Sequence, residues 1–371
     1  MNKRITAYPY SYNPNRFNAF DSGLSFIVVL AAFELIPLAI SVIFRDVLYD
    51  LYSADFFAYM IVNVVLSQLI IFGVAIIWCK IRRANPFSGG GYVAKFDFVQ
   101  ILMSIILVMG VMMTFYFVHL ELAKDSEVLL GEYGYSDINY SKFSGFYALV
   151  YVGLIILMPA IIEEMLFRGI IMRGLEEFGS VAAVIISAVM FSFMHGSFSQ
   201  MLLQFIGGLA IGAVVIITKN WLLGSIMHAF NNFYSSIFQL LITYDLVSSD
   251  WGFSVKTVTN MACIIIGIVC LIVSVLYFGK LALKNKIAKE KGEKIRIPPY
   301  EKREFYLLAD SNGLSYKPDI ERAELKSKRE YDERRFFING EFRKLNAKAP
   351  KVLSIAAICV GLLAAIVLIF I

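Results

Sequence analysis

Two adjacent carboxylates, Glu163 and Glu164, and the guanidinium of Arg168 lie in residues 146–172, which otherwise have the composition of a membrane helix. A charge near the centre of a bilayer costs roughly 2.5 kcal/mol or more, so intramembrane ionisable groups are candidates for function. Glu164 and Arg168 are four residues apart with the acid first, an order that favours an ion pair on one helix face. Glu163 lies about 100° around the helix and has no partner at that spacing. The spacing predicts one carboxylate neutralised by arginine and one left for chemistry. The alternative is a salt-bridge cluster that only locks helices together.

Two later apolar segments carry the other polar groups that could share this site. His195 follows Phe191 by four residues at the end of residues 181–195, and His228 and Asn232 are four apart within residues 221–243. This spacing places each pair on one helix face. A single polar residue in a membrane helix is often only a packing contact. Three polar clusters on three helices instead predict convergence on a water-accessible cavity.

The composition indicates a membrane protein. Of 371 residues, 58% are hydrophobic and 17% are charged, whereas soluble domains average about 25% charged. Apolar runs of about 17–25 residues mark membrane helices. The predicted spans are residues 24–44, 56–78, 98–120, 146–172, 181–195, 198–218, 221–243, 259–278 and 352–371. The sequence therefore predicts an all-α polytopic membrane protein, with about eight transmembrane helices in a bundle, a charged segment and a ninth C-terminal span. The fifth span is short.

The distribution of charge predicts the orientation and the domains. Lys and Arg concentrate in alternate loops and near the N-terminus, so the positive-inside rule places the N-terminus in the cytoplasm. Because this topology alone accounts for the Lys and Arg residues, no nucleic-acid partner is needed to explain them. The expected location is a plasma membrane, of bacterial type. The predicted division is a cytoplasmic N-terminus 1–21, a transmembrane domain 22–279 with a motif core at 146–234, a charged cytoplasmic segment 280–351 and a C-terminal helix 352–371.

The three motifs Glu-Glu-x-x-x-Arg, Phe-x-x-x-His and His-x-x-x-Asn resemble those of a known family. They are similar to the CAAX protease and bacteriocin-processing (CPBP, or Abi) family of intramembrane proteases, which includes the CAAX prenyl endopeptidases. All three motifs are complete and in order within residues 146–234. The resemblance implies an α-helical membrane endopeptidase, with a cavity open to the cytosol, that acts on a lipidated or membrane-associated peptide. It carries nothing over to the charged segment or the ninth span.

The resemblance also implies roles for the site residues. Glu163 is the base that activates water, and His195 holds that water or shares its proton. His228 and Asn232 donate hydrogen bonds to the oxyanion that develops during peptide hydrolysis.

The predicted site also includes residues that support the base, and it could include a metal ion. Glu164 and Arg168 orient the base, and Phe191 belongs with them. Two histidines and a carboxylate, His195, His228 and Glu163, could also bind zinc and leave one position for water. The residue types leave a metal site and a metal-free, glutamate-activated water both open, with a lean toward the metal-free route. Membrane lipid and the peptide substrate are the expected partners, and the sequence leaves the oligomeric state open.

The predicted site depends on one geometric condition, and the sequence leaves two alternative functions open. Glu163 lies near the cytosolic end of its predicted span, whereas His195 lies near the outer end of its own. The two residues meet only if the helix that carries Glu163 continues to about residue 178, or if Gly196 ends a short, deep helix that carries His195. A non-proteolytic scaffold or bacteriocin-immunity protein on the same fold is the main alternative, and the intact motifs favour the enzyme. A transporter is a third possibility, but the sequence lacks the repeated halves typical of one.

Overall fold

The computed structural model describes residues 7–8, 17–82, 96–130, 145–243, 253–290, 295–296 and 351–370. Helices dominate this part of the chain, and the prediction of an all-α protein is confirmed. The two short strands β1 (Ala7–Tyr8) and β2 (Ile295–Arg296) pair antiparallel. The helical elements are α1 (Ala19–Ile43), α2 (Arg45–Ala54), α3 (Phe56–Ile81), α4 (Phe98–Leu130), α5 (Gly145–Leu166), η2 (Phe167–Ile171), α6 (Met172–Leu175), η3 (Glu176–Phe178), α7 (Ser180–Phe193), α8 (Phe198–Thr218), α9 (Trp221–Thr243), α10 (Phe253–Glu290) and α15 (Lys351–Phe370).

The protein is a multi-pass membrane protein. Six of the described helices are long and apolar enough to cross a membrane, judged by length and composition: α1, α3, α4, α8, α10 and α15. α7 is a shorter apolar helix, as predicted for the fifth span. The total of eight or nine spans stays a prediction. Several helices extend beyond their predicted apolar runs, because a helix can continue past the hydrocarbon region with polar residues.

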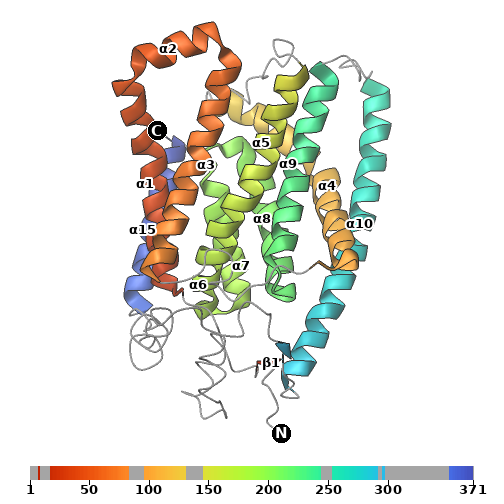
Figure 1. Cartoon of the computed structure of the whole chain (residues 1–371). Coiled ribbons are helices and arrows are strands. Elements are labelled where there is room, and N and C mark those ends of the chain that lie inside the picture. Colours follow the sequence, from red (N-terminus) through yellow and green to blue (C-terminus); the bar gives the residue numbers. More distant parts are fainter. Residues whose placement is uncertain are drawn as a thin grey trace, which may run out of the picture.

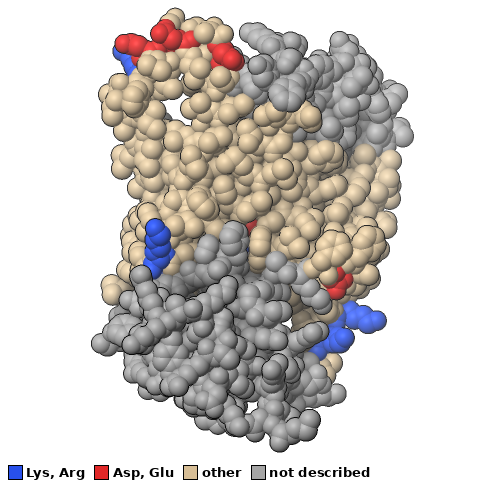
Figure 2. Space-filling model, in the orientation of Figure 1, with Lys and Arg blue, Asp and Glu red and all other residues tan. Residues whose placement is uncertain are grey.

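The long helices form a bundle in which α5 is central to the site. α5 packs against α3 on one side and α9 on the other, α7 pairs with α8, α4 with α10, and α1 with the C-terminal helix α15 (Figure 1). The described surface is mostly uncharged along the bundle. Acidic side chains gather over α2 at one end, and most of the visible Lys and Arg lie toward the other end (Figure 2).

The helix that carries the two carboxylates is longer than the sequence predicted. Helical structure runs without a break from Gly145 to Phe178, through a π-helical turn at η2 and a final 3₁₀ turn at η3. At about 1.5 Å per residue, Glu163 lies about 27 Å from one end of this helix and about 22 Å from the other. α7 ends at Phe193, and the backbone turns at Gly196 with φ 64°. Glu163 therefore lies near the middle of its helix, which removes the predicted difference in depth from His195.

The beginning of α1 is fixed against the end of this same helix. Asn18 and Asp21 form a reciprocal capping box at the N-terminus of α1. Asp21 also pairs with Arg82, which directly follows α3, through Nη2 to Oδ2 at 2.7 Å and Nε to Oδ1 at 2.9 Å. Ser22 donates a hydrogen bond to the carbonyl of Ile171 at 2.7 Å. These contacts join α1, α3 and η2 at one end of the bundle.

We expect Gly174→Ala to destabilise this junction. A Cβ at Gly174 would lie 2.2 Å from the Asn18 carbonyl oxygen and 2.2 Å from Ser22 Oγ. Such overpacking costs about 1–3 kcal/mol of unfolding free energy, which a lower Tm of the purified protein in detergent would report. Gly153→Ala on α5 is the control, because a Cβ there meets nothing within 4 Å. Equal Tm values for the two variants would contradict the close contact.

Candidate functional site

A buried polar cluster lies where α5 meets α3, α9 and the end of α7. Only 9% of Glu163 is exposed, and Glu164, Arg168 and His228 are more deeply buried. The cluster therefore contains two carboxylates, a guanidinium and an imidazole with little access to water. Such groups are stable in the interior only when they neutralise one another and form hydrogen bonds.

Glu164 is the neutralised carboxylate. Arg168 Nη1 donates to Glu164 Oε1 at 2.8 Å, as their spacing predicted. His228 Nδ1 lies 3.0 Å from the same oxygen. Because an ionised carboxylate only accepts hydrogen bonds, Nδ1 is the protonated nitrogen of this contact. One oxygen of Glu164 thus binds both a cation on its own helix and a histidine on α9.

Glu163 has different partners. Its Oε1 accepts a hydrogen bond from Gln68 Nε2 on α3 at 2.9 Å. Its Oε2 lies 3.8 Å from His228 Nε2, too far for a direct hydrogen bond. The sequence argument considered only Glu163's own helix and therefore missed Gln68. The sequence offered one signal for Gln68, a glutamine within a largely apolar span, but nothing that named its partner.

Two glycines and an aromatic ring surround the ion pair of Arg168 and Glu164. Arg168 places its Cζ 4.7 Å from the centroid of the Phe191 ring, a cation–π contact. Its Nη2 donates to the carbonyl of Gly208 on α8 at 3.3 Å. On α9, a Cβ at Gly224 would lie 2.9 Å from Glu164 Oε2. The absence of a side chain at Gly224 therefore makes room for the ion pair.

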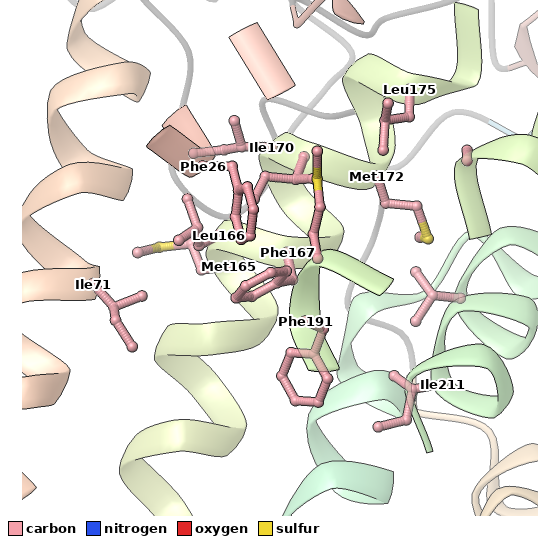
Figure 3. Close-up of a cluster of buried hydrophobic side chains, with 14 of the residues drawn as sticks. Phe26, Ile71, Met165, Leu166, Phe167, Ile170, Met172, Leu175, Phe191 and Ile211 are labelled. Carbon is pink, nitrogen blue, oxygen red and sulfur yellow. The ribbon is translucent and has the colours of Figure 1, made fainter. Parts of the chain in front are cut away.

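Phe191 connects the ion pair to both histidines. Its ring centroid lies 4.9 Å from that of His195 and 5.6 Å from that of His228, each in an edge-on arrangement. Its other neighbour is Phe167, at 5.1 Å. The close-up shows Phe191 beside Phe167 at the edge of the hydrophobic core, with Ile211 nearby (Figure 3). Phe191 therefore fixes the positions of charged and aromatic groups from three helices.

His195 lies just beyond the end of α7 and is partly buried. Its Nδ1 lies 2.8 Å from the carbonyl oxygen of Phe191. A carbonyl only accepts, so Nδ1 carries the hydrogen and Nε2 is the nitrogen left for other contacts. His195 and His228 are thus held in the same way, each through Nδ1, and both contact Phe191.

Asn232 has a partner that its motif did not predict. Its Nδ2 donates to the carbonyl oxygen of Ile155 on α5 at 3.1 Å. In a regular helix this carbonyl would accept from the backbone nitrogen four residues later, which here belongs to Pro159 and has no hydrogen. Asn232 therefore satisfies a carbonyl that a proline leaves unpaired. An amide carries two N–H groups, so one donor is left for another partner.

The three residues of the possible zinc site are not grouped for metal binding in the described structure. Among the described residues, no group of three or more His, Cys, Asp or Glu side chains is placed to hold a metal ion. Glu163, His195 and His228 do not form such a group in this arrangement. The reaction proposed below is derived without a metal.

The part of the chain that holds this cluster matches a known family. Residues 145–234 match the family model described as type II CAAX prenyl endopeptidase Rce1-like. This segment is similar to the Rce1-like family. The match confirms the family resemblance predicted from the three motifs, and it ends at nearly the same residues as the predicted motif core. No curated protein and no solved structure matched the chain. Gln68 lies outside the matched segment.

Replacing Arg168 should be more damaging than replacing Glu163. Arg168→Met leaves the Glu164 carboxylate buried without its cation, which costs about 3–5 kcal/mol of unfolding free energy. Glu163→Gln removes a charge that no cation among the described residues neutralises directly, so we expect a much smaller loss. Thermal unfolding in detergent measures both. Equal losses would contradict the assignment of Glu164 as the ion-paired carboxylate and Glu163 as the free one.

A double-mutant cycle tests the bond between Asn232 and Ile155. Asn232→Leu should cost about 1–3 kcal/mol, because it leaves a partly buried carbonyl unsatisfied. In a Pro159→Ala background the alanine amide can donate to that carbonyl, so Asn232→Leu should cost clearly less. Unfolding free energies of the four proteins give the coupling. The same cost in both backgrounds would contradict the proline explanation.

Proposed function

We propose that this chain is an intramembrane endopeptidase that hydrolyses a peptide bond of a lipidated or membrane-associated peptide. The family description makes a prenylated C-terminal peptide the first substrate to test. One observation carries the proposal. Glu163 Oε2 and His228 Nε2 face each other at 3.8 Å within a buried cluster, and neither atom bonds directly to the other. A water molecule beside this pair can contact both atoms.

The reaction follows from this arrangement. Glu163 Oε2 takes a proton from the water as the water oxygen forms a bond to the scissile carbonyl carbon. The carbonyl oxygen becomes an oxyanion, which the second N–H of Asn232 can stabilise. The protonated Glu163 then gives its proton to the amide nitrogen as the C–N bond breaks. Glu163 returns to its starting state, and the products are a carboxylic acid and an amine, which exchange a proton to become a carboxylate and an ammonium group.

The other members of the cluster support Glu163 in different ways. Glu164 pairs with Arg168 and holds His228 by Nδ1, so the ring presents Nε2 to Glu163. His195 is held through Nδ1 and presents Nε2, in keeping with a role in binding water. Phe191 packs against both rings and excludes water from the ion pair.

We also infer that the N-terminus and the basic end of the bundle face the cytoplasm. The end formed by α2 is acidic, and the positive-inside rule places basic ends in the cytoplasm (Figure 2). Substrate would then reach the site from the cytosolic side. The corresponding location is the plasma membrane, with the domain division 1–21, 22–279, 280–351 and 352–371.

The decisive experiment compares peptide termini in membranes that contain the wild type or Glu163→Gln. We expect a set of termini that appears only with the wild type, because the variant lacks the base but keeps the size of the side chain. Glu34→Gln on α1 is the matched control, since it changes an exposed carboxylate in another apolar helix. Its termini should equal those of the wild type.

The opposite result would favour another function. Identical termini for the wild type and Glu163→Gln, at equal protein levels, would contradict the protease. A scaffold or bacteriocin-immunity protein on the same fold would then be the better explanation.

A further inference from the structure

Among the described residues of α3, Gln68 is the one whose side chain bonds directly to the proposed base. It is buried, with 6% of its surface exposed, whereas the next residue, Leu69, is 54% exposed. α3 therefore turns Gln68 inward toward α5. Its Nε2 donates to Glu163 Oε1 at 2.9 Å, across 95 residues of sequence.

The other polar side chains of the same stretch behave differently. Asn63 donates to the carbonyl of Tyr59 at 3.1 Å, and Ser67 donates to the carbonyl of Asn63 at 2.9 Å. Both side chains therefore donate to backbone carbonyls of α3 itself. Gln68 instead reaches another helix, which separates its role from that of a polar residue satisfied locally.

The bond defines the orientation of the Glu163 carboxylate. The terminal torsion of a glutamate side chain is broad and has no strongly preferred angle. A donor at Oε1 restricts that torsion and leaves Oε2 as the oxygen that faces His228. Without the donor, the carboxylate can rotate away from the position in which it would take a proton from water.

Gln68 also has an atom that the described protein does not use. Its Oε1 is buried and finds no hydrogen-bond partner among the described residues. A buried acceptor costs free energy when it stays unpaired, so this oxygen is left to accept a hydrogen bond from a water molecule.

We propose that Gln68 is a positioning residue for the reaction: it holds Oε1 of Glu163, so that Oε2 takes the proton from the attacking water. This role rests on the proposed endopeptidase function. It adds to the active site a residue from α3, outside the segment that matches the family.

The test uses Gln68→Met and Gln68→Asn, with an internally quenched peptide that ends in a farnesylated cysteine and three further residues. Methionine keeps the length and removes the donor. Asparagine keeps the amide but is shorter by one methylene and cannot reach Glu163. Since misplacement of a catalytic group by about 1 Å can cost about 100-fold in rate, we expect both variants to lose about 10- to 100-fold in kcat, with KM within about threefold of the wild type.

A control and two contrary outcomes make the result decisive. Asn63→Leu, which removes an exposed amide from the same helix, should leave kcat and KM unchanged. If the two Gln68 variants keep the wild-type kcat while Glu163→Gln is inactive, the role of Gln68 is wrong and the protease stands. A wild-type protein that cleaves neither this peptide nor any membrane peptide in a Glu163-dependent way contradicts both proposals together. If Gln68→Met does not fold, Gln68→Asn alone decides, because it retains the polarity of the position.

Discussion

The buried pair of Glu164 and Arg168 is the interaction on which the rest of the site depends. A carboxylate and a guanidinium removed from water are stable only when close together and well hydrogen-bonded. Their 2.8 Å bond meets this condition, and neighbouring elements are shaped around it. Gly224 leaves room for the carboxylate, the carbonyl of Gly208 accepts from the guanidinium, and the Phe191 ring covers it. The pair therefore joins α5, α7, α8 and α9 in one place.

The pair also allows two adjacent carboxylates to have different properties. Glu164 bonds to a cation and a histidine through one oxygen, and it is almost fully buried. Glu163, one residue earlier, points to α3 and bonds only to a neutral amide among its described partners, while it remains slightly more exposed. A base must be able to accept a proton, and a carboxylate locked to arginine is a poor one. The helix geometry, which turns successive residues to different neighbours, thus separates the ion-paired carboxylate from the one that we propose as the base.

Sequence spacing predicted the ion pair within one helix and missed the individual hydrogen bonds between helices. The four-residue spacing of Glu164 and Arg168 predicted their bond, and the three motifs predicted the family. The bond from Gln68 to Glu163 could not be predicted, because the packing of α3 on α5 follows from tertiary contacts that spacing does not encode. Asn232 shows the same limit: its motif implied an oxyanion donor, whereas its bond to Ile155 depends on the facing proline. Six of the predicted apolar spans coincide with helices that are long and apolar enough to cross a membrane, but the helix ends differ from the predicted ones, since hydropathy does not report where a helix stops.

The length of the α5–η3 helix explains how residues predicted at different depths can meet. Extension to Phe178 puts Glu163 near the middle of a long helix. α7 is short, and the backbone turns at Gly196 soon after it ends. The π-helical turn at η2 lies directly after the two carboxylates and includes Arg168. Such turns often occur at functional sites, where they redirect side chains. Because Ser22 of α1 bonds to the carbonyl of Ile171 in this turn, the N-terminal helix supports the irregular backbone on which the ion pair is built. The family segment therefore relies on helices that lie outside it: α1 supports the turn, and α3 contacts the proposed base.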